Sequence, residues 1–118
     1  MLLYIHTTCS TCKDAIRFLE KQNVVFTIRD IVKQPPSKAE LHAMLTHQNG
    51  NVKKLLNTSG MLYREMNLSE RLKQMELDEI ITLLSSHGML IKRPFLLGDK
   101  FGVIGFKEPQ WHEKLMKI

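Results

Sequence analysis

The sequence predicts a single α/β domain spanning residues 1–118, in which a β-α-β unit and a β-β-α unit build a four-stranded mixed sheet. β-type runs lie near the two ends of the chain, whereas helical periodicity fills the region of about 37–88 between them. A chain of this length, with 43% hydrophobic and 25% charged residues, is long enough to bury one core without crosslinks. The middle region is therefore expected to be a helical insertion within one domain.

The first thirty residues predict a strand, a helix and a second strand. Leu2 to His6 is a short β-type run, and residues 24–29 form another run, rich in β-branched and aromatic side chains. About twenty residues separate the two runs, which favours a parallel pair joined by a right-handed crossover. The helix between them is indicated by apolar residues at the i, i+3, i+4 and i+7 positions of one face: Cys12, Ala15, Ile16 and Leu19.

The middle of the chain predicts only helices. Ser37 and Glu40 have the spacing of a capping box, so a helix over about 37–46 should begin there and end at Asn49-Gly50. Residues 52–72 then predict two or three short helices, interrupted at 57–60. A stronger helix is expected at 76–86, where Gly88 is placed to end it and one face carries Leu77, Ile80, Ile81 and Leu84.

The last quarter of the chain returns to β structure. Phe95–Leu97 and Val103–Phe106 flank a turn-forming Gly98-Asp99-Lys100 segment, which predicts an antiparallel hairpin. Glu108-Pro109 opens a final helix, which Trp111 is expected to hold against the sheet. The complete order describes a thioredoxin-like domain with extra helices.

Composition restricts the classes of partner. The first residues lack the features of a signal peptide, and no apolar stretch approaches the roughly 20 residues of a membrane span, so we expect a cytoplasmic protein. Seventeen Lys and Arg against twelve Asp and Glu give a net charge of +5, but no basic run exceeds two residues. This pattern favours a solvated surface over a nucleic-acid-binding face, while leaving room for attraction of an anion at one site.

Cys9 and Cys12, the only cysteines in the chain, lie at the predicted junction of a strand and a helix. A helix amino terminus favours negative charge, so Cys9 is the candidate thiolate and nucleophile. Cys12, on the buried stripe one turn later, is the candidate resolving thiol. Two alternatives remain: the thiols are inert structural residues, or they bind zinc together with His6, although no fourth ligand is evident. We expect no cofactor and no resident metal.

Arg93-Pro94 is the second candidate site feature, because it directly precedes the predicted hairpin. A thioredoxin-like domain brings a cis proline next to the reactive cysteine at this point of the chain. Placed there, the guanidinium of Arg93 would stabilise the Cys9 thiolate and hold an oxyanion through paired hydrogen bonds. The alternative is a turn proline beside a solvated arginine.

Four segments together carry a family resemblance: Cys9–Lys13, Leu55–Thr58 with Tyr63–Glu65 after it, Gly88–Pro94 and Val103–Phe106. With these segments the chain resembles the arsenate reductase (ArsC)-like family, in particular its two-cysteine branch, which includes the Spx regulators. The resemblance implies a thioredoxin-like fold with an inserted helical subdomain, and it implies Arg93-Pro94 beside Cys9. It also implies a thiol-disulfide oxidoreductase whose reductant is thioredoxin, glutaredoxin or a low-molecular-weight thiol.

Two departures from the family pattern qualify what the resemblance implies. Arsenate reductases of this type have three arginines around the cysteine; Arg93 matches one, but Asn57 and Gly105 stand at the other two positions, so tight arsenate binding is not expected.

Gly50 matches a glycine on the surface with which Spx regulators meet the carboxy-terminal domain of the RNA polymerase α subunit. The resemblance therefore also implies an alternative function, a redox-sensing regulator that binds polymerase without contacting nucleic acid directly.

Overall fold

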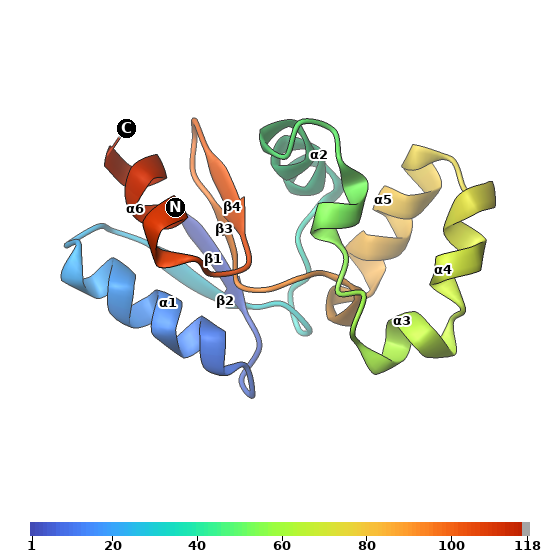
Figure 1. Ribbon diagram of the computed structural model, residues 1–118, viewed down its shortest axis with the longest axis horizontal. Helices are drawn as coiled ribbons and strands as arrows, with labels where there is room; N and C mark the ends of the chain where they lie inside the picture. Colours follow the sequence, from blue (N-terminus) through green and yellow to red (C-terminus); the bar gives the residue numbers. More distant parts are fainter. Residues whose placement is uncertain (117–118) are drawn as a thin grey trace.

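The computed structural model describes residues 1–116, and its centre is a four-stranded sheet in the order β2-β1-β3-β4 (Figure 1). The strands are β1 (Leu2–Ile5), β2 (Thr27–Asp30), β3 (Phe95–Leu97) and β4 (Gly102–Ile104). β1 pairs with β2 in parallel and with β3 antiparallel, and β3 pairs antiparallel with β4. The expected mixed sheet and carboxy-terminal hairpin are thus confirmed.

Helices cover both faces of the sheet because successive side chains of a strand point to opposite faces. On one face, Leu3 of β1 packs in a core with α1 (Ser10–Lys21) and with Trp111 of α6 (Glu108–Met116). On the other face, Tyr4 packs in a second core with α2 (Lys38–His47) and the inserted helices. Figure 1 shows this division, with α1 and α6 to the left of the sheet and the other helices to its right.

The insertion begins with α2 and continues, still between β2 and β3 in the chain, as further helical segments. These are η1 (Val52–Leu55), α3 (Met61–Glu65), α4 (Leu68–Arg71), η2 (Leu72–Gln74), α5 (Leu77–Ser86) and η3 (Gly88–Leu90). Ile80, Ile81 and Leu84 of α5 are buried as expected, but Leu77 is 45% exposed. Leu77 is the first residue of α5, and the packed face of the helix begins a turn later.

Two strands differ from the expected bounds. β2 begins at Thr27 instead of residue 24, and Val25 is 89% exposed. β2 pairs only with β1, whose ladder starts at Leu2 opposite Thr27, so the preceding residues have a β-type composition but no partner strand. β4 ends at Ile104 instead of residue 106, because Gly105 has a left-handed φ of +70° that takes the chain out of the ladder.

Two adjacent segments that we call the neck, residues 55–57 and 90–92, connect the part of the insertion that contains α3, α4 and α5 to the rest of the protein. Leu56 and Ile91 form an antiparallel bridge. On either side of it, the Asn57 amide donates to the Leu90 carbonyl and the Lys92 amide donates to the Leu55 carbonyl, each at 2.8 Å. The backbone therefore fixes the distance between residues that lie 35 positions apart in the chain, such as Leu56 and Ile91.

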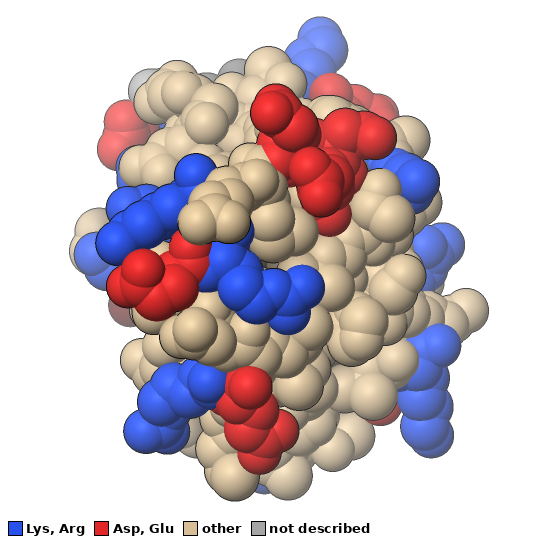
Figure 2. Space-filling view, turned by 90° about the vertical axis from the view of Figure 1, so that its right-hand side faces the viewer, with Lys and Arg blue, Asp and Glu red and all other residues tan. Residues whose placement is uncertain are grey.

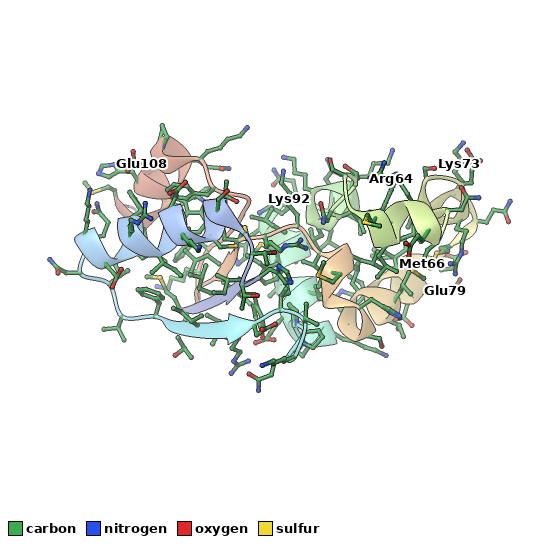
Figure 3. All side chains as sticks on the ribbon, turned by 90° about the horizontal axis from the view of Figure 1, so that it is seen from below. Arg64, Met66, Lys73, Glu79, Lys92 and Glu108 are labelled. Carbon is green, nitrogen blue, oxygen red and sulfur yellow. The ribbon has the colours of Figure 1, made fainter. Side chains whose placement is uncertain are left out.

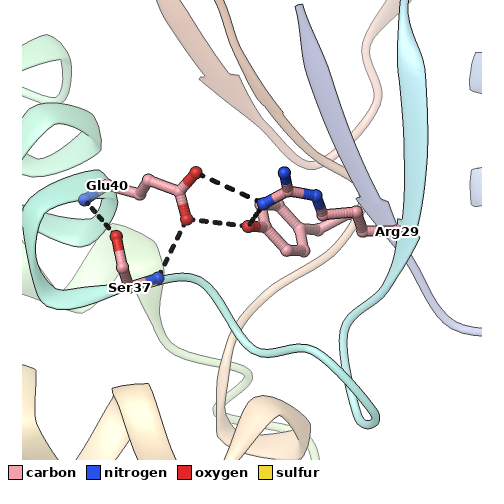
Figure 4. A network of polar contacts seen from close by, with 4 residues as sticks. Arg29, Ser37 and Glu40 are labelled. Atoms are coloured by element: carbon pink, nitrogen blue, oxygen red, sulfur yellow. Dashed lines mark hydrogen bonds and ion pairs between the residues drawn. The ribbon is translucent and has the colours of Figure 1, made fainter.

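A polar network fastens α2 to the sheet (Figure 4). The buried Tyr4 hydroxyl donates to Glu40 Oε1 at 2.7 Å and accepts from Arg29 Nη1 at 3.0 Å. Arg29 also pairs with the other carboxylate oxygen of Glu40 at 3.7 Å. Glu40 at the same time closes the capping box of α2 with Ser37, which confirms the helix start expected from the sequence.

We expect Glu40→Ala to lower the free energy of unfolding by about 2 kcal/mol, since it removes a helix cap and the acceptor of a buried hydroxyl. Glu79 offers a matched control, because it closes the capping box of α5 without such a network. Glu79→Ala should cost about 1 kcal/mol. Urea unfolding of both variants measures the difference, and equal losses would show that the Tyr4 network adds nothing.

Charges of both signs alternate on the face formed by the inserted helices. Figure 2 shows that face, with Lys and Arg side chains lying next to Asp and Glu. One such pair is Lys73 with Glu70 at 3.4 Å. No continuous basic field covers this face, in agreement with the surface expected from the sequence. Among residues 1–116, no helix is long and apolar enough to cross a membrane.

Candidate functional site

Cys9 is the N-cap residue of α1. The chain leaves β1 at Ile5 and turns, with the Cys9 amide donating to the His6 carbonyl at 3.1 Å. Cys9 has an extended backbone, and its Sγ accepts from the Cys12 amide at 3.2 Å. Sulfur thus occupies the place that a serine or aspartate oxygen has at other helix starts. The expected strand-to-helix junction is confirmed, and the Cys9 sulfur lies at the positive end of the helix dipole.

The surroundings of Cys9 favour its thiolate. Partial burial by itself raises the pKa of the thiol, but hydrogen bonds from Cys12 and Thr11 and the charge of Arg93 outweigh it, so the pKa lies below the ordinary value. The Thr11 hydroxyl lies 3.1 Å from the sulfur. Because the thiolate is the reactive form of cysteine, these contacts favour Cys9 as the nucleophile.

Cys12 has the opposite environment. It is 1% exposed, on the buried stripe of α1, whereas Cys9 is partly exposed, and both are free thiols. Burial, followed by the hydrogen bond to Cys9, raises the pKa of the Cys12 thiol. A protonated inner thiol beside an ionised outer one is the arrangement that a nucleophile and its resolving thiol require. Phe18, which the sequence pattern missed, shares the same buried face of α1.

Arg93 and Pro94 lie beside this loop, joined by a cis peptide bond. An open pocket of about 360 Å³ is lined by residues 8–11, Asn57, Lys92 and Arg93, and we call it the Cys9 pocket. The guanidinium of Arg93 is partly buried, and its Nη1 donates weakly, at 3.4 Å, to the carbonyls of Met89 and Ile91. The structure therefore brings the sequence-predicted residues together at one site, with Pro94 buried next to it.

Lys92 is the site residue that sequence reasoning missed. Gly105, where the family pattern has an arginine, leaves space that the Lys92 side chain crosses: a Cβ built on Gly105 would lie 2.9 Å from Lys92 Cε. The ammonium group of Lys92 thus lies near the position at which the family pattern has an arginine side chain. Figure 3 shows Lys92 at the junction of the sheet half and the helical half. Its sequence signals were its place in the Lys92-Arg93 pair and in the Gly88–Pro94 segment that carries the family resemblance.

His6 lies at the end of β1, and its ring Nδ1 contacts the Thr8 hydroxyl at 2.7 Å. In the part of the chain that the structure describes, no three His, Cys, Asp or Glu side chains are gathered as a metal site would need. The residues His6, Cys9 and Cys12, considered together from the sequence, therefore do not form a ligand set in this geometry.

The rate of Cys9 alkylation by iodoacetamide should rise with pH along a curve whose midpoint lies below about 8.5, since only the thiolate reacts. Thr11→Val removes a hydrogen bond that lowers the pKa of Cys9, so it should move the midpoint to higher pH. Thr7→Val, an exposed position in the same loop, is the control. Identical midpoints in the two variants would contradict the role given to Thr11. Peptide mass spectrometry identifies the alkylated cysteine.

Known proteins match this chain along almost its full length. A model of the ArsC family matches residues 4–114. The uncharacterized protein YusI of Bacillus subtilis (strain 168) is 43% identical over 113 residues, which cover 96% of this chain and 96% of YusI. The global transcriptional regulator Spx of Streptococcus mutans is 25% identical over 108 residues, which cover 92% of this chain and 77% of the regulator.

Among solved structures, a possible arsenate reductase from Streptococcus mutans UA159 matches with a TM-score of 0.84 and 36% identity. The match covers 94% of this chain and 96% of that chain. The inserted helices are therefore included in the likeness, and the expected thioredoxin-like α/β fold is confirmed.

Proposed function

Because the chain belongs to the ArsC family, we propose that it is a thiol-disulfide oxidoreductase in which Cys9 is the nucleophile and Cys12 the resolving thiol. One observation carries this proposal: the Cys9 sulfur caps α1 at the wall of an open pocket, while Cys12 is buried one turn further along the same helix. Structural cysteines have no need of such a division between an accessible, acidified sulfur and a protected one.

The proposed reaction takes place in two exchange steps. The Cys9 thiolate attacks one sulfur of a substrate disulfide; the S–S bond breaks, a mixed disulfide forms at Cys9, and the first thiol leaves as its thiolate. Cys12 then loses its proton and attacks the Cys9 sulfur, releasing the second thiol. The substrate gains two electrons, each released thiolate takes up one proton, and the protein is left with a Cys9–Cys12 disulfide. An external dithiol or two thiols, from thioredoxin, glutaredoxin or a small thiol, restore it.

A redox titration of the Cys9–Cys12 pair tests the proposal. The pair should show one two-electron transition in glutathione or dithiothreitol buffers, detected by mass-resolved alkylation, and the reduced protein should be oxidised by a model disulfide. A measured reduction potential also gives the direction of electron flow. Failure to form the Cys9–Cys12 disulfide at any potential would reject the oxidoreductase function.

For arsenate itself we propose weak binding. Arg93 is the one arginine in the Cys9 pocket, and Asn57 contributes a neutral amide at a position where the family pattern has a guanidinium. Charge-assisted hydrogen bonds are worth about 1.5–3 kcal/mol each, so loss of such donors weakens an oxyanion site by roughly tenfold or more per donor. Lys92 compensates for part of this loss as a point charge.

A redox-sensing regulator is the second candidate, and one observation favours it. Gly50, which matches the polymerase-contacting glycine of the Spx branch, is exposed after α2 with a φ of +77° and open space around it. The partner would be the carboxy-terminal domain of the RNA polymerase α subunit. A pull-down with that domain, using reduced and oxidised protein, decides between the candidates, and absence of a complex in both states removes this one.

A further inference from the structure

A second pocket, of about 160 Å³, lies next to the Cys9 pocket, and we call it the lysine pocket. It is lined by Gln48, Lys54, Lys92, Ile104, Lys107 and Gln110. These residues come from the end of α2, η1, the neck, β4 and the start of α6, so the fold gathers three lysines from distant parts of the chain. Gln48 is 8% exposed and its Nε2 donates to the Gly102 carbonyl at 3.1 Å, which holds one wall in place.

Within residues 1–116, no carboxylate lines this pocket beside its three lysines. The ion pairs of Arg17 with Asp14, Arg29 with Glu40 and Lys73 with Glu70 involve none of these lysines. The other polar groups of the lining are the amides of Gln48 and Gln110. Three lysines around a small cavity without a lining carboxylate attract an anionic group.

Lys92 belongs to the walls of both pockets. Its side chain passes over Gly105, where a Cβ would come within 2.9 Å of Cε and 3.4 Å of Nζ. The absence of a side chain at Gly105 therefore allows this lysine to stand between the two pockets. The two pockets therefore adjoin at Lys92, with Cys9 in the wall of one and Lys54 and Lys107 in the wall of the other.

We propose that the lysine pocket is a specificity-determining subsite that receives a carboxylate carried by the disulfide substrate reduced at Cys9. The inference rests on the proposed oxidoreductase function and deepens it by naming a substrate class, the carboxylate-bearing disulfides. The small volume admits one such group with a few atoms of its chain. Lys54 and Lys107 bind it as point charges, and Lys92 orients the part of the molecule between the carboxylate and the reacting sulfur.

The test uses two disulfides that differ only in charge, dithiodibutyrate and its neutral diamide. Pre-reduced protein is mixed with each, and the second-order rate constant for oxidation of the Cys9–Cys12 pair is measured. Wild-type protein should prefer the carboxylate. In Lys54→Gln/Lys107→Gln the ratio of the two rate constants, carboxylate over diamide, should fall by about fivefold to tenfold, the effect of two exposed charge pairs.

A matched control distinguishes the effect of the pocket lysines from the effect of the protein's net charge. Lys33→Gln/Lys100→Gln removes the same two charges at exposed positions outside both pockets and should leave the ratio unchanged. A second arm repeats the comparison with a cystine peptide bearing glutamate or glutamine two residues from the cysteine. A lysine-dependent preference in the first arm assigns the subsite to small disulfides, and one in the peptide arm alone assigns it to protein substrates.

The outcomes distinguish failure of the oxidoreductase function from failure of the carboxylate subsite. If neither disulfide nor peptide oxidises the protein, the oxidoreductase function itself fails. If all of them oxidise it, and the charge preference is absent or survives in Lys54→Gln/Lys107→Gln, the function stands and the carboxylate subsite is overturned.

Discussion

Cys9→Ser is expected to abolish disulfide reduction, with a loss of more than about a thousandfold, since a serine hydroxyl at this position is not ionised near neutral pH. Cys12→Ser should instead leave the first exchange step intact. The protein would then accumulate as a mixed disulfide at Cys9, because no resolving thiol remains one turn along α1. Intact-mass spectrometry after mixing with a model disulfide measures both results.

Each cysteine variant requires a check that the protein still folds. Cys9 is partly exposed and Cys12 is buried, so Cys12→Ser carries the greater risk of unfolding. Cys12→Ala removes the resolving thiol without burying a hydroxyl, and it should trap the same adduct. Circular dichroism verifies the fold of each variant. Turnover by folded Cys9→Ser, or release of both thiols by folded Cys12→Ala, would contradict the roles assigned to the pair.

Gly88→Ala is expected to destabilise the protein by about 3 kcal/mol or more, a large effect for one methyl group. A Cβ at this position would lie 1.8 Å from the backbone carbonyl oxygen of Ile31 and 2.6 Å from its carbon. The obstacle is backbone that follows β2, so it cannot rotate aside as a flexible side chain would. Relief requires η3 to move away from the loop after β2, at the expense of buried contacts.

Gly50→Ala is the control for that variant. Gly50 has a φ of +77° with no heavy atom within 4 Å of a built Cβ, so alanine there meets backbone strain without a clash. It should cost about 1–2 kcal/mol. Urea denaturation with a common m-value compares the two. A smaller loss for Gly88→Ala than for Gly50→Ala would show that the contact with Ile31 relaxes easily.

The sequence predicted best those features that depend on neighbours along the chain. The start of α2 follows from Ser37 and Glu40, three residues apart, and the capping geometry of Cys9 follows from a junction that hydrophobic periodicity locates. Strand limits were less accurate. The start of β2 depends on where β1 offers a partner, and the composition of residues 24–26 contains no information about that.

The functional site, like the strands, was predicted less well where it depends on residues that are distant in the sequence. A local pattern identified both cysteines, whereas the approach of Arg93 to them was implied only by the predicted thioredoxin-like fold and by the family resemblance. The approach of Lys92 to Gly105 depends on side-chain packing between segments that touch only after folding, and so does the gathering of Lys54 and Lys107 around it. The second pocket therefore had no counterpart in any sequence pattern.

The bridge between Leu56 and Ile91 has a mechanical consequence. Asn57 and Lys92 belong to the two segments of the neck, and Arg93 directly follows Lys92, so backbone hydrogen bonds hold these three walls of the Cys9 pocket together. We expect these walls to keep their spacing, with the loop of residues 8–11 facing them across the pocket. A displacement of the neck relative to that loop would therefore change the width of the gap in front of the reactive sulfur.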